Sequence, residues 1–155
     1  MDDSQKSRIS ERAPKSCAAP RMDRSLRVVF AEDDEAMRQL VTASLSRKGF
    51  DVVECSNGAE LAAIIERHFE RGAHPSVDVI VSDVQMPGRT GLECLKGIRR
   101  INQKVPFIII TAFGDKRTFE EAFEAGATAV FDKPFDLEEL VQAIRQAVSS
   151  KTQAG

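Results

Sequence analysis

Short apolar segments, each followed by a segment with helical spacing, constrain the fold of this chain more than any other feature. Phe107–Ile110 is an unbroken apolar run after Pro106, and such a run is typical of a strand buried on both faces. Strands that alternate with helices pair in parallel, and helices cover both faces of the sheet. The pattern therefore predicts an α/β domain with a doubly wound parallel sheet. Its predicted strands are Arg27–Ala31, Asp51–Glu54, Val77–Ser82, Phe107–Ile110 and Ala127–Phe131.

The predicted helices are bounded by residues that commonly begin or end helices. Asn57 and Asp136 can cap helix N-termini, and Gly49 and Gly126 can adopt the left-handed conformation that ends many helices. The predicted helices are Asp34–Lys48, Asn57–Arg71, a helix marked by Leu92, Leu95, Ile98 and Ile101, a helix from about Phe119 to Gly126, and Asp136–Val148.

The periodic pattern divides the chain into one domain and two tails. Residues 1–25 show no periodicity and mix basic residues with Ser and Pro, so we interpret them as a flexible tail; Met22 is an alternative start. We expect a folded domain over residues 26–149 and a short C-terminal tail over 150–155. With 42% hydrophobic and 30% charged residues, the composition is that of a globular protein.

Composition argues against several function classes. The net charge of −2 offers no basic field for nucleic acid or an anionic membrane, and no apolar run approaches a bilayer span. The first 25 residues lack the apolar core of a signal peptide, so we expect a cytoplasmic protein. The three cysteines (Cys17, Cys55 and Cys94) have no CxxC spacing and read as reduced thiols. With only His68 and His74, a histidine-based metal site is poorly supported.

Chemically active residues stand where the predicted strands end. The first strand ends in Glu32-Asp33-Asp34, the third in Asp83, the fourth in Thr111, and Lys133-Pro134 follows the fifth. Sites in parallel α/β sheets form at the carboxyl ends of strands, so these groups should converge. Carboxylates that can hold Mg²⁺, a hydroxyl and an ammonium suit phosphoryl transfer, with a carboxylate as nucleophile.

Each of these residues also has an ordinary structural explanation. Asp34 fits a helix N-cap, Asp83 a turn residue, Thr111 a hydroxyl-stabilised turn, and Lys133 a solvated loop charge. Taken singly, none of them establishes a site. Together, at successive strand ends of one sheet edge, they favour the functional interpretation.

Four stretches of the chain make a family resemblance specific. VVFAEDDEAMR, VIVSDVQMPGRTGLECL, IIITAF and FDKPFD resemble, in order and spacing, the receiver domain of bacterial response regulators. The resemblance covers about residues 26–149 and implies a flavodoxin-like (βα)5 fold with strand order 2-1-3-4-5. It also implies phosphorylation by a histidine kinase or histidine phosphotransfer protein, and a change in the surface of the fourth helix, fifth strand and fifth helix that an unidentified downstream protein would recognise.

The resemblance also implies a role for each site residue. Asp83 would be the phospho-acceptor, Thr111 the switch hydroxyl and Lys133 the phosphate partner, with a cis bond between Lys133 and Pro134. Mg²⁺ would be held by Asp33, Asp83 and the backbone carbonyl of Gln85, with Glu32 acting through water.

Three positions depart from the family's pattern. Glu32 replaces the commoner Asp, which still permits a water-mediated contact. Val130 stands where the family has its switch aromatic, and Phe131, one residue later, should point to the opposite face of its strand. Gln85 and Phe113 would flank the phosphoryl group, and we hypothesise that bulky Phe113 slows autodephosphorylation.

Alternative functions remain open from the residues alone. A Mg²⁺-dependent phosphohydrolase usually needs a second acid two residues past its nucleophile, where this chain has Gln85. A receiver-like interaction module that takes no phosphate is favoured only by Val130. A flavodoxin-like cofactor carrier is disfavoured because the chain has no Trp, no Tyr and no Ser/Thr-rich phosphate loop. The short segment after the last helix fits a stand-alone chain, and a fragment of a longer regulator is the other option; direct DNA binding is not expected.

Overall fold

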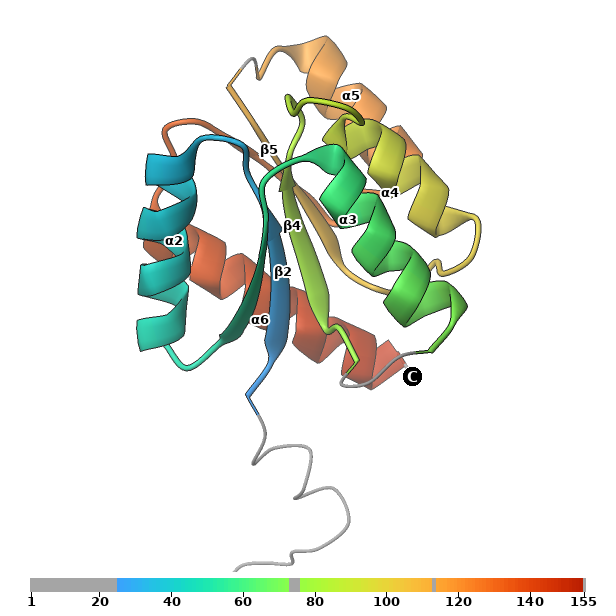
Figure 1. Ribbon diagram of the computed structural model, residues 1–155, viewed down its shortest axis with the longest axis horizontal. Helices are drawn as coiled ribbons and strands as arrows, with labels where there is room; N and C mark the ends of the chain where they lie inside the picture. Colours follow the sequence, from blue (N-terminus) through green and yellow to red (C-terminus); the bar gives the residue numbers. More distant parts are fainter. Residues whose placement is uncertain (1–24, 73–75, 113, 155) are drawn as a thin grey trace, which may run out of the picture.

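A five-stranded parallel sheet lies between two layers of helices in the computed structural model, which describes residues 25–72, 76–112 and 114–154 (Figure 1). The strands are β2 (Arg27–Ala31), β3 (Asp51–Cys55), β4 (Val79–Asp83), β5 (Phe107–Thr111) and β6 (Ala129–Asp132). They pair in the order β3-β2-β4-β5-β6, and each neighbouring pair is parallel. Counted along the chain, this is the order 2-1-3-4-5, so the expected fold is confirmed.

Helices connect the strands and begin at side chains that cap them. Asp34 accepts a hydrogen bond from the Met37 N–H, and Asn57 accepts one from the Glu60 N–H. Gly49 and Gly126 have φ of 96° and 108°, the left-handed values expected after a helix. The helical segments are α2 (Glu35–Arg47), α3 (Gly58–Ile65), a π-helical turn η2 (Glu66–Glu70), α4 (Gly91–Arg99), α5 (Lys116–Ala125) and α6 (Leu137–Ala154).

Several predicted boundaries differ from the observed ones. The last helix does not end at Val148 but continues to Ala154, through part of the segment expected to be a tail, because no Gly or Pro interrupts it before Gly155. The third predicted strand loses its first two residues and gains Asp83. Asp78 lies outside the strand because its carboxylate accepts a hydrogen bond from the Arg27 N–H (2.8 Å).

The second predicted helix and the fifth predicted strand, which also gains Asp132, differ from the observed elements. The helix predicted over Asn57–Arg71 gives way to the π-helical turn at Glu66. The last strand begins at Ala129, not Ala127, because the Ala127 N–H donates to the Ala122 carbonyl (2.9 Å) and closes the end of α5. Residues 1–24 with Cys17 and Met22, and also His74 and Phe113, lie outside the described residues.

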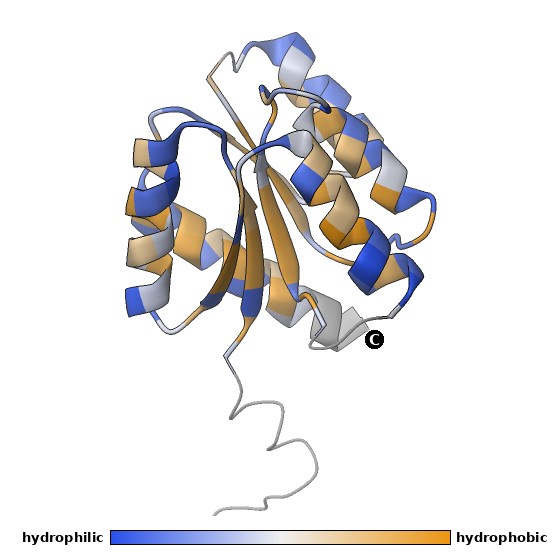
Figure 2. Cartoon of the chain, in the orientation of Figure 1, coloured by the Kyte–Doolittle hydropathy of each residue, from blue (hydrophilic) through white to orange (hydrophobic). Residues whose placement is uncertain are grey.

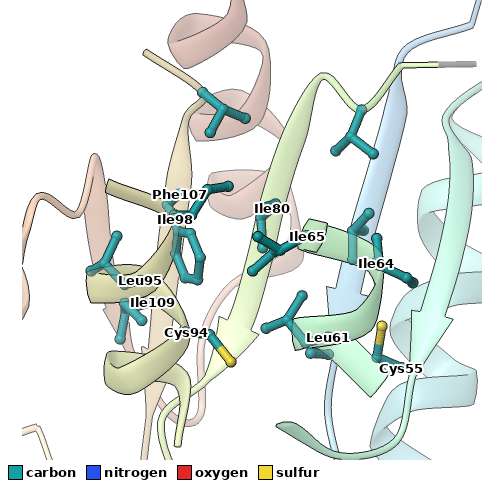
Figure 3. Packing of buried hydrophobic residues seen from close by; sticks show 14 of the residues in the cluster. Cys55, Leu61, Ile64, Ile65, Ile80, Cys94, Leu95, Ile98, Phe107 and Ile109 are labelled. Carbon is teal, nitrogen blue, oxygen red and sulfur yellow. The ribbon is translucent and has the colours of Figure 1, made fainter. Parts of the chain in front are cut away.

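The core has two halves, one on each face of the sheet. One lies under α3, α4 and α5 and includes Leu61, Leu95 and Ile109 (Figure 3). The other lies under α2 and α6 and includes Leu45 and Ile144. Figure 2 shows mostly hydrophobic strands between helices in which hydrophobic and hydrophilic residues alternate. Of the helices in the described ranges, none has the length and apolarity needed to cross a membrane.

Candidate functional site

The carboxyl edge of the sheet gathers the side chains that the sequence placed at strand ends. Glu32 follows β2, Asp83 and Thr111 are the last residues of β4 and β5, and Lys133 follows β6. In the ladder Thr111 lies opposite Asp132, and the Lys133 N–H donates to the Thr111 carbonyl (2.8 Å). Parallel pairing therefore brings these residues to one edge, as predicted.

Lys133 lies between two buried carboxylates. Its Nζ atom donates to Oε1 of Glu32 at 2.8 Å and to Oδ2 of Asp83 at 2.6 Å. The Glu32 and Asp83 side chains are 2% and 5% exposed, and that of Lys133 is 19% exposed. The Lys133–Pro134 bond is cis, as expected from the resemblance. The ammonium is thus placed to neutralise charge at the tip of Asp83.

Burial and hydrogen bonding have opposite effects on the pKa of the Glu32 carboxyl and of the Lys133 ammonium. Burial raises the pKa of the Glu32 carboxyl above its usual value, although hydrogen bonds from Lys133 and from the Asp34 N–H (3.1 Å) oppose the rise. For Lys133, burial favours the neutral amine, but hydrogen bonds to Asp83 and Glu32 outweigh it and raise its pKa. Lys133 therefore keeps its charge in the site.

Three carboxylates form a set that could hold a hard cation. Glu32, Asp33 and Asp83 each offer an oxygen, and these oxygens lie within 4.8 Å of one another. Glu32 and Asp83 are buried and Asp33 is exposed, so the cluster opens to solvent on one side. Carboxylate oxygens are the ligands that Mg²⁺ prefers, and the donor set fits this ion.

The loop after Asp83 makes backbone hydrogen bonds close to the Asp83 carboxylate. The Gln85 N–H donates to Oδ1 of Asp83 (3.0 Å), and the Gly91 N–H donates to the Val84 carbonyl (3.0 Å). Gln85 is therefore adjacent to the acid cluster. That its carbonyl binds metal, and that Glu32 acts through water, remain predictions.

Thr111 is 1% exposed, at the end of β5. Its backbone is tied to Lys133, but its role as switch hydroxyl remains a prediction. The combination of an anionic oxygen at Asp83, an adjacent ammonium and further acids is chemically suited to accepting a phosphoryl group.

Val130 and Phe131 point to opposite faces of the sheet, as their places on one strand predicted. Val130 packs against the core half under α3, α4 and α5, and Phe131 packs against the half under α2 and α6. The Phe131 ring centroid lies 6.4 Å from that of Phe135. Phe131 therefore does not replace an aromatic at position 130. The hypothesis on Phe113 concerns a residue outside the described ones.

One residue beside the site was given no role from the sequence. Arg38, on α2, donates from Nη1 to the backbone carbonyl of Glu32 at 2.8 Å. Its Nε atom donates to Oε1 of Glu54 on β3 at 3.2 Å. The only signal in the sequence was its helical spacing, four residues after the cap Asp34, which places both on one side of α2.

Comparisons with known proteins agree with this geometry. The family model described as "Response regulator receiver domain" matches residues 28–145. The sporulation initiation phosphotransferase F of Bacillus subtilis (strain 168) is 28% identical over 126 residues, which cover 81% of this chain and 96% of that protein. The receiver domain of the Francisella response regulator 1452 superposes with a TM-score of 0.73 at 26% identity, covering 81% of this chain and 98% of the other.

A longer relative matches over only part of its length. The DNA-binding transcriptional regulator NtrC of Escherichia coli (strain K12) is 34% identical over 122 residues. These residues are 79% of this chain but 24% of NtrC. The chain thus spans about a quarter of the length of that regulator.

Proposed function

The chain belongs to the response regulator receiver domain family, and on this basis we propose that it is the phospho-receiver of a two-component signal transduction system. Asp83 is the proposed phospho-acceptor. The observation that carries the proposal is the 2.6 Å contact between Lys133 Nζ and Asp83 Oδ2 inside a cluster of three acids. A buried carboxylate with a fixed cation beside it is suited to attack on phosphorus and to neutralisation of the product.

The proposed reaction is a direct transfer to Asp83. A carboxylate oxygen of Asp83 forms a bond to phosphorus while the bond from phosphorus to the donor breaks, and the donor leaves with that electron pair. A carboxylate nucleophile has no proton to lose in this step, so no general base is needed. Mg²⁺, when bound by Asp33, Asp83, the Gln85 carbonyl and, through water, Glu32, would neutralise charge on the phosphoryl oxygens.

Lys133 and Thr111 have separate roles in the proposal. The Lys133 ammonium, now shared by Glu32 and Asp83, would pair with a phosphoryl oxygen after transfer. The Thr111 hydroxyl would donate to another phosphoryl oxygen and move the loop that leads into α5. The protein thus acts as a switch that catalyses only its own phosphorylation and dephosphorylation.

The proposed output is a change in the surface formed by α5, β6 and α6. α5 follows the Thr111 loop, and β6 leads into Lys133, so both elements join the site directly. A histidine kinase or histidine phosphotransfer protein would supply the phosphoryl group, and a downstream protein would recognise the altered surface. We propose that this occurs in the cytoplasm, without direct contact to nucleic acid or membrane.

Incubation with Mg²⁺ and acetyl phosphate tests the proposal. The intact mass should rise by one phosphate, and both Asp83→Asn and chelation of Mg²⁺ should abolish the rise. Asp34→Asn is the matched control, because Asp34 caps α2 through Met37 and Asn is an equally good N-cap. A wild-type protein that gains no phosphate would contradict the proposal and favour an interaction module that takes none.

A further inference from the structure

We propose that Arg38 is a positioning residue of the metal site, which holds the acidic loop Glu32–Asp34 in the geometry that Mg²⁺ requires. The inference rests on the proposed function, because it concerns the same site. It assigns a role to a side chain that would contact neither the metal nor the phosphoryl group.

Arg38 joins three elements around that loop. Its guanidinium comes from α2, binds the Glu32 carbonyl after β2 at 2.8 Å, and pairs with Glu54 of β3 at 3.2 Å. The Arg38 side chain is 16% exposed and that of Glu54 is 42% exposed, so the bond to the Glu32 carbonyl is the better shielded of the two. Two donors of one planar group thus fix the peptide of Glu32 relative to both the helix and the edge strand.

The Glu32 carbonyl completes a set of bonds that holds every polar group of this residue. Its N–H donates to the Cys55 carbonyl (3.0 Å), and its two carboxylate oxygens accept from Lys133 and from the Asp34 N–H. The Glu32 carbonyl and the nitrogen of Asp33 belong to the same peptide group, and Asp33 is the exposed acid of the cluster. Rotation of this peptide would therefore move Asp33 directly.

Charge alone predicts the opposite effect from positioning. Arg38 is a cation near three acids, so its removal should strengthen Mg²⁺ binding if only its repulsion of the metal mattered. Glu54 pairs with the guanidinium and reduces that repulsion. If Arg38 acts by positioning, its removal should instead weaken Mg²⁺ binding, because the ligands lose their arrangement.

The test is the Mg²⁺ affinity of Arg38→Lys and Arg38→Ala by titration calorimetry, without a phosphodonor. Arg38→Lys keeps the positive charge but lacks the planar guanidinium with its two donors. A loss of Mg²⁺ affinity in this variant therefore reflects lost geometry and not lost charge. We expect the Kd for Mg²⁺ to rise about 10-fold in both variants, the lower end of the range for residues that orient metal ligands. Arg47→Ala, on the same helix but bound to Ser44, should leave the Kd unchanged.

Amide hydrogen exchange in the metal-free protein gives a second readout. Loss of the Arg38 contacts should accelerate exchange at Asp34, whose N–H binds Glu32, while amides at the end of α2 stay protected. An Arg38→Lys variant with wild-type affinity, or a tighter Kd in Arg38→Ala, would overturn the positioning role. If the wild type binds no Mg²⁺, the proposed function fails with it; if the wild type binds and Arg38→Lys matches it, only the role of Arg38 fails. Should Arg38→Ala not fold, Arg38→Lys decides.

Discussion

Among the single residues of the site, Glu32 has an ionised form that its surroundings disfavour. The residue is 1% exposed, and its burial raises the pKa of the carboxyl despite the hydrogen bonds from Lys133 and Asp34. A carboxyl with a raised pKa in the folded state stabilises the fold most below its unfolded pKa. That contribution is lost as pH rises through the folded pKa. Ionised Glu32 therefore lowers stability at neutral pH when no metal is bound.

Glu32→Gln should stabilise the metal-free protein at pH 7. Glutamine can still accept a hydrogen bond from Lys133 but carries no buried charge, so we expect the free energy of unfolding to rise by on the order of 1 kcal/mol. The difference should shrink at acidic pH, near and below the ordinary pKa of a glutamate carboxyl, because Glu32 is then itself protonated. Urea unfolding in the presence of a chelator, at pH 7 and at an acidic pH where Glu32 is protonated, measures this difference in stability. A variant less stable than wild type at pH 7 would show that the Lys133 ion pair outweighs burial.

The sequence predicted which residues form the site, but it did not predict the contacts between them. Asp83, Thr111 and Lys133 could be chosen because strand ends of a parallel sheet meet at one edge. The sharing of one ammonium between Glu32 and Asp83 depends on contacts between residues far apart in the chain. Arg38 was missed because its partners are a backbone carbonyl and a glutamate on another element, which no local pattern specifies.

Among the elements, the loop between β4 and α4 can pack closely against its neighbours because two of the contacting residues are glycines without a Cβ atom. A Cβ on Gly91 would collide with the Asp83 carbonyl, and one on Gly58 would collide with the Arg89 carbonyl. The Gly58 N–H also donates to the Pro87 carbonyl (3.2 Å), which ties the loop to the start of α3. The loop that carries Gln85 is therefore held by close backbone contacts on both sides.

Gly91→Ala should destabilise the protein by about 1–3 kcal/mol, because the methyl group forces the loop away from Asp83. Gly97→Ala is a matched control on the same helix, since a Cβ there meets nothing within 4 Å. It should stabilise α4 by up to about 1 kcal/mol through the better helix propensity of alanine. Thermal unfolding of both variants tests this, and a Gly91→Ala protein as stable as wild type would contradict the steric argument.

Element types were predictable, but several element ends were not. An unbroken apolar run predicted β5, and caps such as Asn57 predicted helix starts. The β4 boundary shifted because the Asp78 side chain binds the Arg27 N–H, a tertiary contact. α6 ran past Val148 because the polar residues after it are compatible with a helix, and polarity alone does not end one.

For the whole molecule, the central question is how a change at Asp83 could reach the α5, β6 and α6 surface. Thr111 lies at the end of β5, and the next helix is α5. Val130 offers no aromatic side chain for Thr111 to displace, and Phe131 packs on the other face. We therefore expect the loop between β5 and α5 to carry the signal.

Phosphorylation should change amide exchange in that loop and in α5 in a way that depends on Thr111. Thr111→Ala keeps Lys133 and the proposed acceptor Asp83, so it should still gain phosphate, while the change in amide exchange in α5 is lost. Hydrogen exchange with mass spectrometry, before and after acetyl phosphate, measures both, with Asp83→Asn as the unphosphorylated control. An unaltered exchange response in Thr111→Ala would rule out this route.

The overall topology illustrates the same limit of sequence reasoning. Alternating strands and helices predicted a doubly wound parallel sheet, but the order of its strands came from the family resemblance and not from the pattern. Strand order depends on which crossovers bury the most surface on each face. The strand order therefore depends on packing throughout both halves of the core and not on the sequence of any one segment.

Identification of the modified residue decides whether Asp83 accepts the phosphoryl group. After reaction with acetyl phosphate and Mg²⁺, borohydride reduces an aspartyl phosphate to homoserine and releases phosphate, which marks the acceptor permanently for peptide mapping. We predict homoserine at position 83 and unmodified aspartate at positions 33 and 34. Homoserine at another position, or a protein that gains phosphate with Asp83 unmodified, would contradict it.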